Sequence, residues 1–436
     1  MEFNINIWDE VVKWLHENGK FTPEMLTEEP ARNLIGETNR ILSDAVHLSI
    51  TEEVPPELTA QLEQNTYVFS AFKGFHNLKE ASLKLTNEKG GIKPFETFKQ
   101  DVLKVHKTYN VNYLESEYNF AVQSAQMAVK WADYAADGDR YYLQYRTAGD
   151  GKVRAEHAAL HGTTLPVDDP FWDKYFPPLG WNCRCTAVQV RKDKYTVSDS
   201  ATAMQAGNNA TSGKKQQMFR FNPGKEGKIF PPKHPYLPKG CEGCKKNNIR
   251  LAFSNSNEKC STCVYAQKNL QYEQNKMEYE RLKNDPKYTE VEFDNISGGV
   301  TGIHIGHNLD KIGGVYERHV LNAGRKAGRR VRLEDESRHR NHTRFTEGMW
   351  DEKEFEVAGR ETATENNLLR GLKHCAAKMT TKIAILDFPN GGFNEETLQK
   401  AISRYKGLEK LNDGQYLAFE KIICVQDETI VYEEDF

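Results

Sequence analysis

The chain has 436 residues, which is enough for about two to four domains of ordinary size. It carries 59 Lys and Arg against 62 Asp and Glu, and the net charge of −3 excludes a histone-like polycation and a mainly acidic tail protein. No run of about eighteen apolar residues occurs, and the N-terminus lacks a basic segment followed by an apolar one. We therefore expect no membrane-spanning segment and no secretory signal, and we expect synthesis in a reducing bacterial cytoplasm.

The first two thirds of the chain change character several times. Residues 1–134 are expected to be a helical region, because apolar residues recur at helical spacing from Ile7 to Leu15 and again over residues 118–134. Residues 135–200 are rich in turn residues around short strands and are expected to form a small, loop-rich α+β core. Residues 201–235 have the composition of an extended basic linker. Ten Lys and Arg stand against two acids from Lys214 to Arg250.

The last third of the chain alternates helix and strand patterns. Residues 269–292 are expected to be a helical connector, and residues 293–436 an α/β domain with strands such as 331–333, 383–388 and 419–425. Ten Lys and Arg stand against five acids from Asp310 to Arg344. Each basic stretch has two interpretations. It contacts phosphate or an acidic partner, or it is an ordinary solvated surface.

Four cysteines have the spacing of a structural zinc site. The pattern is two Cys-x2-Cys pairs fifteen residues apart, made by Cys241, Cys244, Cys260 and Cys263. Four thiolates close a tetrahedron around Zn²⁺ and leave no position for substrate, so the metal would fold a zinc knuckle over residues 236–268. Two unrelated surface pairs or redox motifs are the alternative.

A second set of metal-binding residue types lies in the small core. His157 and His161 are four residues apart, and Cys183 and Cys185 follow about twenty residues later. Imidazole and thiolate are ligands for Zn²⁺, so His157, Cys183 and Cys185 are candidate metal ligands, with His157 preferred to His161. A structural histidine and two small buried thiols explain the same residues.

The core carries motifs that resemble those of the phage Mu F-like minor head protein family. They are Tyr145-Arg-Thr, Val153-Arg-x-x-His157-Ala-Ala-Leu, Asp168-Asp-Pro-Phe-Trp172 and Pro178-x-Gly-Trp-Asn-Cys-Arg-Cys185. The likeness extends over about residues 1–265. It implies a low-copy virion protein in the phage head, near the portal, with portal and head proteins as partners. It also implies that the protein is required for head assembly or for events during DNA entry.

Residues 293–436 are similar to the C-terminal nuclease domain of contact-dependent growth-inhibition toxins, a PD-(D/E)xK-like arrangement. The resemblance makes Glu317, Asp351 and Glu356 catalytic residues that hold Mg²⁺, and it implies an immunity protein as a partner. A divalent metal held by clustered carboxylates activates water and offsets charge on the scissile phosphate. The basic residues Arg325, Arg329, Arg330 and Arg332 would then bind the nucleic-acid backbone.

The chain departs from this nuclease pattern at one position. Ala358 stands where the pattern has a lysine, two residues after Glu356, which implies an inactive domain unless Lys353, Arg360 or Lys382 substitutes. A separate hypothesis uses His339 and His342 as general acid and base of a metal-free ribonuclease. Two functions follow from the sequence. One is a phage minor head protein with a nuclease-like passenger; the other is a polymorphic-toxin effector nuclease, cleaving tRNA or DNA, with a packaging or delivery module.

Overall fold

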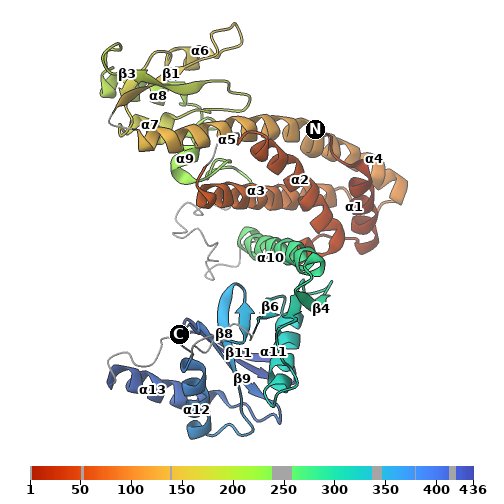
Figure 1. Cartoon of the computed structure of the whole chain (residues 1–436). Helices are drawn as coiled ribbons and strands as arrows, with labels where there is room; N and C mark the ends of the chain where they lie inside the picture. Colours follow the sequence, from red (N-terminus) through yellow and green to blue (C-terminus); the bar gives the residue numbers. More distant parts are fainter. Residues whose placement is uncertain are drawn as a thin grey trace. The chain divides into compact units, whose positions relative to one another are not determined.

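The computed structural model describes residues 2–50, 54–137, 140–237, 258–335, 346–378, 380–411 and 419–436, without the side chains of residues 258–263 and 409–411. The chain divides into two compact units, Met1–Asn269 (unit 1) and Leu270–Phe436 (unit 2). The expected mixture of helix and strand, with a helical N-terminal region, is confirmed (Figure 1). Within the described ranges no helix combines the length and apolarity that crossing a membrane requires.

Unit 1 begins with a set of packed helices. The elements are α1 (Ile5–Asn18), η1 (Pro23–Thr27), α2 (Glu29–His47), α3 (Pro56–Ser82), α4 (Phe95–His106), the π-helical η2 (Lys107–Tyr113) and α5 (Leu114–Ala136). The side chain of Asn4 caps α1 by accepting from the Asn6 N–H, and Gly19 ends that helix with a φ of 64°. The long helix α5 leads directly into the small sheet that follows.

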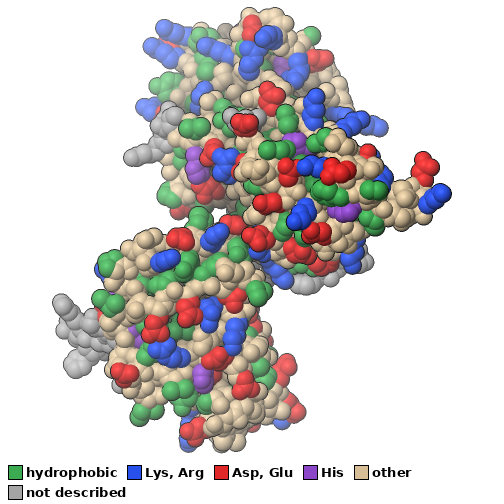
Figure 2. All heavy atoms as spheres, turned by 90° about the vertical axis from the view of Figure 1, so that its right-hand side faces the viewer, with side chains coloured by type: hydrophobic (Ala, Val, Ile, Leu, Met, Phe, Trp, Pro, Cys, Tyr) green, Lys and Arg blue, Asp and Glu red, His purple; other side chains and the backbone are tan. Residues whose placement is uncertain are grey.

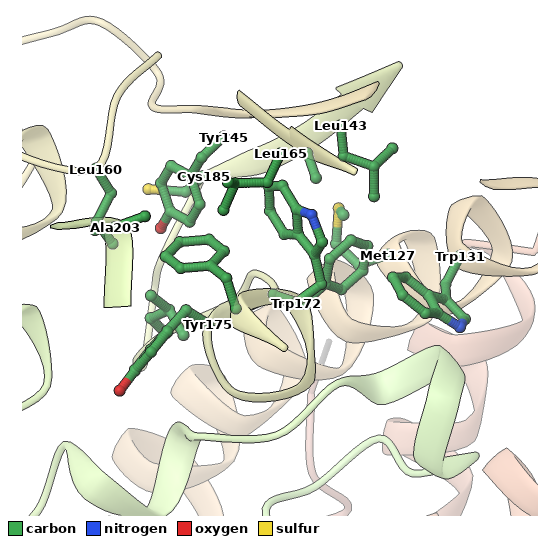
Figure 3. Packing of buried hydrophobic residues seen from close by; sticks show 14 of the residues in the cluster. Met127, Trp131, Leu143, Tyr145, Leu160, Leu165, Trp172, Tyr175, Cys185 and Ala203 are labelled. Carbon is green, nitrogen blue, oxygen red and sulfur yellow. The ribbon is translucent and has the colours of Figure 1, made fainter. Parts of the chain in front are cut away.

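A three-stranded antiparallel sheet forms the second part of unit 1. Its elements are β1 (Tyr141–Arg146), α6 (Ala155–Ala158), β2 (Thr164–Pro166), α7 (Phe171–Tyr175) and β3 (Thr186–Arg191), with strand order β2-β1-β3. Trp172 is fully buried in the centre of its core, and its indole N–H donates to the Pro166 carbonyl at 2.9 Å. Figure 3 shows this core, in which Met127 and Trp131 of α5 pack near Trp172. The motifs of residues 145–185 therefore build one compact core around α5.

The segment expected to be an extended linker is folded onto this core. It contains α8 (Ser200–Ala210), η3 (Gln217–Phe219) and α9 (Pro223–Glu226). Asp199 caps α8 by accepting from the Thr202 N–H at 2.7 Å. A Cβ on Gly207 would lie 2.4 Å from the Tyr175 ring, so glycine lets α8 pack closely against α7. Small residues thus replace the large apolar ones by which a packed helix is usually recognised.

Helix α10 (Glu258–Asn284) runs across the boundary between the units, and the rest of unit 2 is an α/β fold. Its elements are β4 (Tyr288–Phe293), β5 (Val300–His304), α11 (Gly314–Lys326), β6 (Arg330–Leu333), β7 (Gly348–Trp350), β8 (Lys353–Gly359), α12 (Glu365–Ala376), β9 (Ile383–Phe388), α13 (Glu395–Leu411), β10 (Lys421–Gln426) and β11 (Thr429–Asp435). The sheet has the order β11-β10-β9-β8-β7-β6-β5-β4. The pairs β5–β6, β8–β9 and β9–β10 are parallel, and each pair is joined through one helix.

Helices cover both faces of this sheet. Figure 1 shows α11 on one side of the strands and α12 and α13 on the other. Phe355 and Val357 of β8 pack in the same core cluster as residues of α11, whereas Ala358 packs with residues of α12 and α13. Strands β5, β6, β8, β9 and β10 run in the same direction. The loops that follow these strands therefore meet at one edge of the sheet, which is where α/β proteins usually place their ligand sites.

Candidate functional site

Three of the predicted metal ligands meet in unit 1. His157 lies on the single turn α6, and Cys183 and Cys185 lie in the loop before β3. The Nδ1 atom of His157 is 3.7 Å from the Sγ of Cys183 and 3.7 Å from the Sγ of Cys185. All three side chains are at most 5% exposed. We call these residues the thiol–imidazole cluster.

Hydrogen bonds hold the two loops of this cluster together. The Arg184 guanidinium forms a bidentate ion pair with Asp150 at 2.7 and 2.8 Å, and Arg154 donates to the Trp181 carbonyl at 2.7 Å. His161 lies apart from the thiols, because its Nδ1 accepts from the N–H and the hydroxyl of Thr147. The structure therefore places His157, and not His161, beside the two cysteines.

A buried tyrosine completes the surroundings of the thiols. Tyr145 of β1 is fully buried, and within the described part of the chain its hydroxyl has no hydrogen-bond partner. Burial and then the Cys183 and Cys185 thiols raise the pKa of Tyr145 well above its ordinary value. Figure 3 shows the Tyr145 ring beside Cys185. The local sequence pattern does not indicate this residue, because strand composition alone does not show which face a tyrosine occupies.

The cluster fits a tetrahedral metal ion. Zn–N and Zn–S bonds of about 2.05 and 2.3 Å at a tetrahedral angle place nitrogen and sulfur about 3.6 Å apart, close to the spacing found here. Thiol hydrogen bonds to imidazole also suit that spacing. The identity of the three side chains therefore says more about metal binding than the distances do. Two cysteines and one histidine are typical of Zn²⁺. An adjoining recess of about 20 Å³, lined by Lys152, Arg154 and Asn182, has room for one water.

A second group of charged residues lies in unit 2, around the carboxyl end of β6 and the neighbouring part of β8. Its carboxylates are Glu317 in the first turn of α11, Glu347 just before β7, and Glu356 in β8. Glu317 and Glu356 are 3% and 1% exposed. Ligand atoms of Glu317 and Glu347, together with His307 of the β5–α11 loop, lie within 4.8 Å of one another. We call Glu317, Glu347 and Glu356 the carboxylate cluster.

Two lysines bridge the three carboxylates. The Nζ of Lys311 is 3.0 Å from Glu317 Oε1 and 2.9 Å from Glu347 Oε2. The Nζ of Lys378 is 2.9 Å from Glu347 Oε1 and 2.8 Å from Glu356 Oε2. Burial would raise the pKa of Glu347, but Lys378 and Lys311 outweigh it and lower that pKa. Burial raises the pKa of Glu356 despite His374 and Lys378. Each carboxylate of the cluster is therefore already paired with a cationic side chain.

His307 joins the cluster to the sheet. Its Nδ1 is 2.8 Å from the Glu334 carbonyl oxygen, and its Nε2 is 2.8 Å from Glu317 Oε2. Both neighbours are acceptors, so an imidazolium ring satisfies both contacts. Glu334 also donates its N–H to the Glu347 carbonyl, which fixes Glu347 beside the end of β6.

Asp351 lies at the opposite end of β6 from Glu347. It sits in the β7–β8 turn with a φ of 46°, and its carboxylate accepts from the Arg330 N–H at 3.0 Å and pairs with Arg329 at 3.3 Å. The structure thus links both Glu317 and Glu356 to Glu347 through the two lysines, and neither of them to Asp351. In the sequence, Glu347 is marked only by its position directly before Gly348. It can be recognised as a candidate site residue only when β7 is known to begin at Gly348.

The four arginines expected to bind nucleic acid are paired with acids of unit 2. Arg325 pairs with Glu292, Arg329 with Asp351 and Glu433, Arg330 with Glu352, and Arg332 with Glu278, Glu334 and Glu352. On the face shown in Figure 2, acidic and basic side chains are interspersed. Their charges are largely offset within the chain.

Comparison with known proteins identifies part of unit 1. Residues 89–188 match the family model described as "Phage Mu protein F like protein". The chain contains a Mu F-like region. It is 37% identical over 97 residues to "Putative capsid assembly protein F" of Escherichia phage Mu, and 36% identical over 90 residues to "Mu-like prophage FluMu F protein" of Haemophilus influenzae. These alignments cover 21% and 19% of this chain.

The aligned stretch spans about a fifth of each relative, 22% of its length in both cases. No solved structure matches the chain. The Mu F-like region (residues 89–188) runs from just before α4 into β3 and is shorter than the expected likeness over residues 1–265. It contains the complete thiol–imidazole cluster, whereas the carboxylate cluster lies outside it. Cys241 and Cys244, the side chains of Cys260 and Cys263, and His339 and His342 lie outside the described residues.

Proposed function

We propose that this chain is a phage head protein that takes part in head assembly. The observation that carries the proposal is the match of residues 89–188 to the Mu F-like family, since a matching relative carries a name that includes capsid assembly. The packed core around Trp172 supports it, because the Mu F-like region folds here as part of a compact unit. In this proposal unit 1 binds portal or other head proteins, and the protein is located in the virion.

Purified heads of the phage that encodes this chain are expected to contain it. A chain truncated after Asn269 should still be incorporated, because unit 1 is compact by itself. Trp172→Ala should abolish incorporation, because removing a buried tryptophan costs about 3–5 kcal/mol. Mass spectrometry of gradient-purified heads measures both results. Heads without the full-length chain would contradict the proposal.

A second function is proposed for unit 2, which is metal-dependent cleavage of nucleic acid. The observation that favours it is the carboxylate cluster, three acids linked through Lys311 and Lys378, of which Glu317 and Glu347 lie near the carboxyl ends of β5 and β6, where α/β proteins bind ligands. Carboxylate oxygens suit Mg²⁺, so Glu317, Glu347 and Glu356 are the residues that would hold it. Bound there, the metal would supply an activated water and offset phosphate charge. An effector nuclease recognised by an immunity protein remains the alternative main role.

The full chain is expected to cleave tRNA or duplex DNA in Mg²⁺, and EDTA should stop the reaction. Glu317→Gln and Glu347→Gln should each lower the rate at least about a hundredfold, because each removes charge from the proposed metal site. The control is Glu420→Gln, which changes an exposed acid paired with Lys353. Loss of cleavage in Asp351→Asn but not in Glu347→Gln would favour the set predicted from sequence over the carboxylate cluster.

A further inference from the structure

Lys378 occupies a fixed place between two acids of the carboxylate cluster. It follows the C-terminal end of α12, and its side chain is 14% exposed. The buried Thr381 closes the turn around it by donating to the carbonyls of Cys375 and Lys378 at 2.9 and 2.8 Å. The Cys375 thiol in turn contacts the Glu356 carbonyl of β8 at 3.5 Å. The backbone that carries Lys378 is therefore tied to the strand that carries Glu356.

The surroundings of Ala358 explain why β8 itself does not carry the lysine of the nuclease pattern. Ala358 and Glu356 share one face of β8, since side chains alternate along a strand. Ala358 is 3% exposed and packs with Leu368 and Leu372 of α12. A lysine here would have to pass its charged end through this apolar contact. The small side chain instead lets α12 lie against β8, and α12 brings Lys378 to Glu356 from its own end.

The other cationic side chains that the sequence offered in place of the missing lysine have partners outside the cluster. Lys353 and Lys382 both pair with Glu420, at 2.5 and 3.4 Å, and their side chains are half exposed. Arg360 donates to Asn367 Oδ1 at 3.2 Å. Lys311 does reach the cluster, but its side chain is 31% exposed and comes from the β5–α11 loop. Of these cations, Lys378 alone is both held in place and in contact with Glu356 in the described structure.

We propose that Lys378 supplies the ammonium group that the nuclease pattern places at position 358, so that unit 2 is a competent and not a silenced centre. This rests on the nuclease function proposed above. In hydrolysis of a phosphodiester, a water oxygen bonds to phosphorus, the bond from phosphorus to the leaving oxygen breaks, and a water proton ends on that oxygen. An ammonium beside Glu356 stabilises the negative charge that develops on the non-bridging phosphate oxygens.

The test compares the full chain with Lys378→Gln, which keeps a hydrogen-bond donor without the charge, and Lys378→Arg, which keeps the charge. Cleavage of tRNA and plasmid DNA in Mg²⁺ is measured, together with Mn²⁺ affinity by calorimetry and the unfolding temperature. Lys378→Gln should cleave at least about a hundredfold more slowly and bind Mn²⁺ as tightly or more tightly, because a cation next to the site is gone. Lys378→Arg should recover part of the rate. Lys400→Met, which removes an exposed lysine of α13, is the control.

Other outcomes separate this inference from the nuclease proposal itself. If the unchanged chain cleaves and Lys378→Gln cleaves within about threefold of it, Lys378 has no catalytic role and the nuclease proposal stands. If the unchanged chain is inactive but Ala358→Lys cleaves, the inference is again overturned and the chain is a silenced form. If no variant cleaves and Glu317→Gln leaves Mn²⁺ binding unchanged, both proposals fail.

Discussion

Replacement of both Cys183 and Cys185 by serine is expected to remove one equivalent of zinc from the purified chain and to destabilise unit 1. The physical reason is that the thiol–imidazole cluster joins α6 to the loop before β3, so a metal held there would bind the folded form only. Zinc at about a thousand times its dissociation constant stabilises the folded form by about 4 kcal/mol. For a unit of this size that loss lowers the unfolding temperature by about 8–16 °C.

Metal content by elemental analysis and thermal unfolding by circular dichroism measure these effects. Counting the loss of one equivalent keeps the test independent of any metal held by Cys241, Cys244, Cys260 and Cys263. The matched control is Cys424→Ser, which replaces a buried thiol of β10 in the other unit and should leave the zinc content unchanged. Equal zinc content in the double variant and the unchanged chain would refute the metal site.

The Tyr145→Phe variant tests which group supplies the fourth ligand of a metal ion bound by His157, Cys183 and Cys185. If the Tyr145 hydroxyl binds the metal, the spectrum of the Co²⁺-substituted chain should change, because the ligand field depends on every donor atom. An unchanged spectrum would assign the fourth position to water from the recess beside Arg154. The zinc content should persist in either case, because the histidine and the two thiolates remain.

The sequence singled out His157, Cys183 and Cys185, which the structure brings together, but it could not predict everything that surrounds them. Imidazole and thiolate are metal-ligand types, so the short separations of His157, Cys183 and Cys185 in the sequence were informative. Tyr145 is different. Its position depends on the register of β1 against β3, which pairs Tyr145 with Ala187, and no local pattern states that register.

The make-up of the carboxylate cluster also could not be predicted from local sequence patterns. The expected helices and strands of residues 315–425 are largely confirmed, because apolar runs such as 383–388 are strong signals. However, β7 has only three residues, and the turn that follows it carries Asp351 to the far end of β6. The choice between Glu347 and Asp351 therefore needed the tertiary structure. Likewise, α8 was missed because glycine and alanine, rather than large apolar residues, make its contact with Tyr175.

A buried ion pair ties α3 to the Mu F-like region and carries the last prediction. The Lys73 ammonium contacts the Glu117 carboxylate, and both side chains are at most 4% exposed. Burial lowers the pKa of Lys73 and raises that of Glu117, while each partner's charge opposes the change. Lys73 precedes residues 89–188 and Glu117 lies within them. The pair therefore couples α3 to the region that matches the Mu F-like family model.

Lys73→Met is expected to destabilise unit 1 by about 3–5 kcal/mol, because it leaves the Glu117 carboxylate buried without its cation. The double variant Lys73→Met/Glu117→Leu should recover most of this loss, since two apolar side chains of similar size bury no unpaired charge. Urea unfolding of the full chain, followed in unit 1, gives the coupling free energy of the double-mutant cycle. Lys13→Met is the matched surface control: its partner Glu17 is 62% exposed, and the change should cost less than about 1 kcal/mol. A single variant as stable as the unchanged chain would mean that water reaches Glu117 in solution, and that α3 is joined to the Mu F-like region by apolar packing instead.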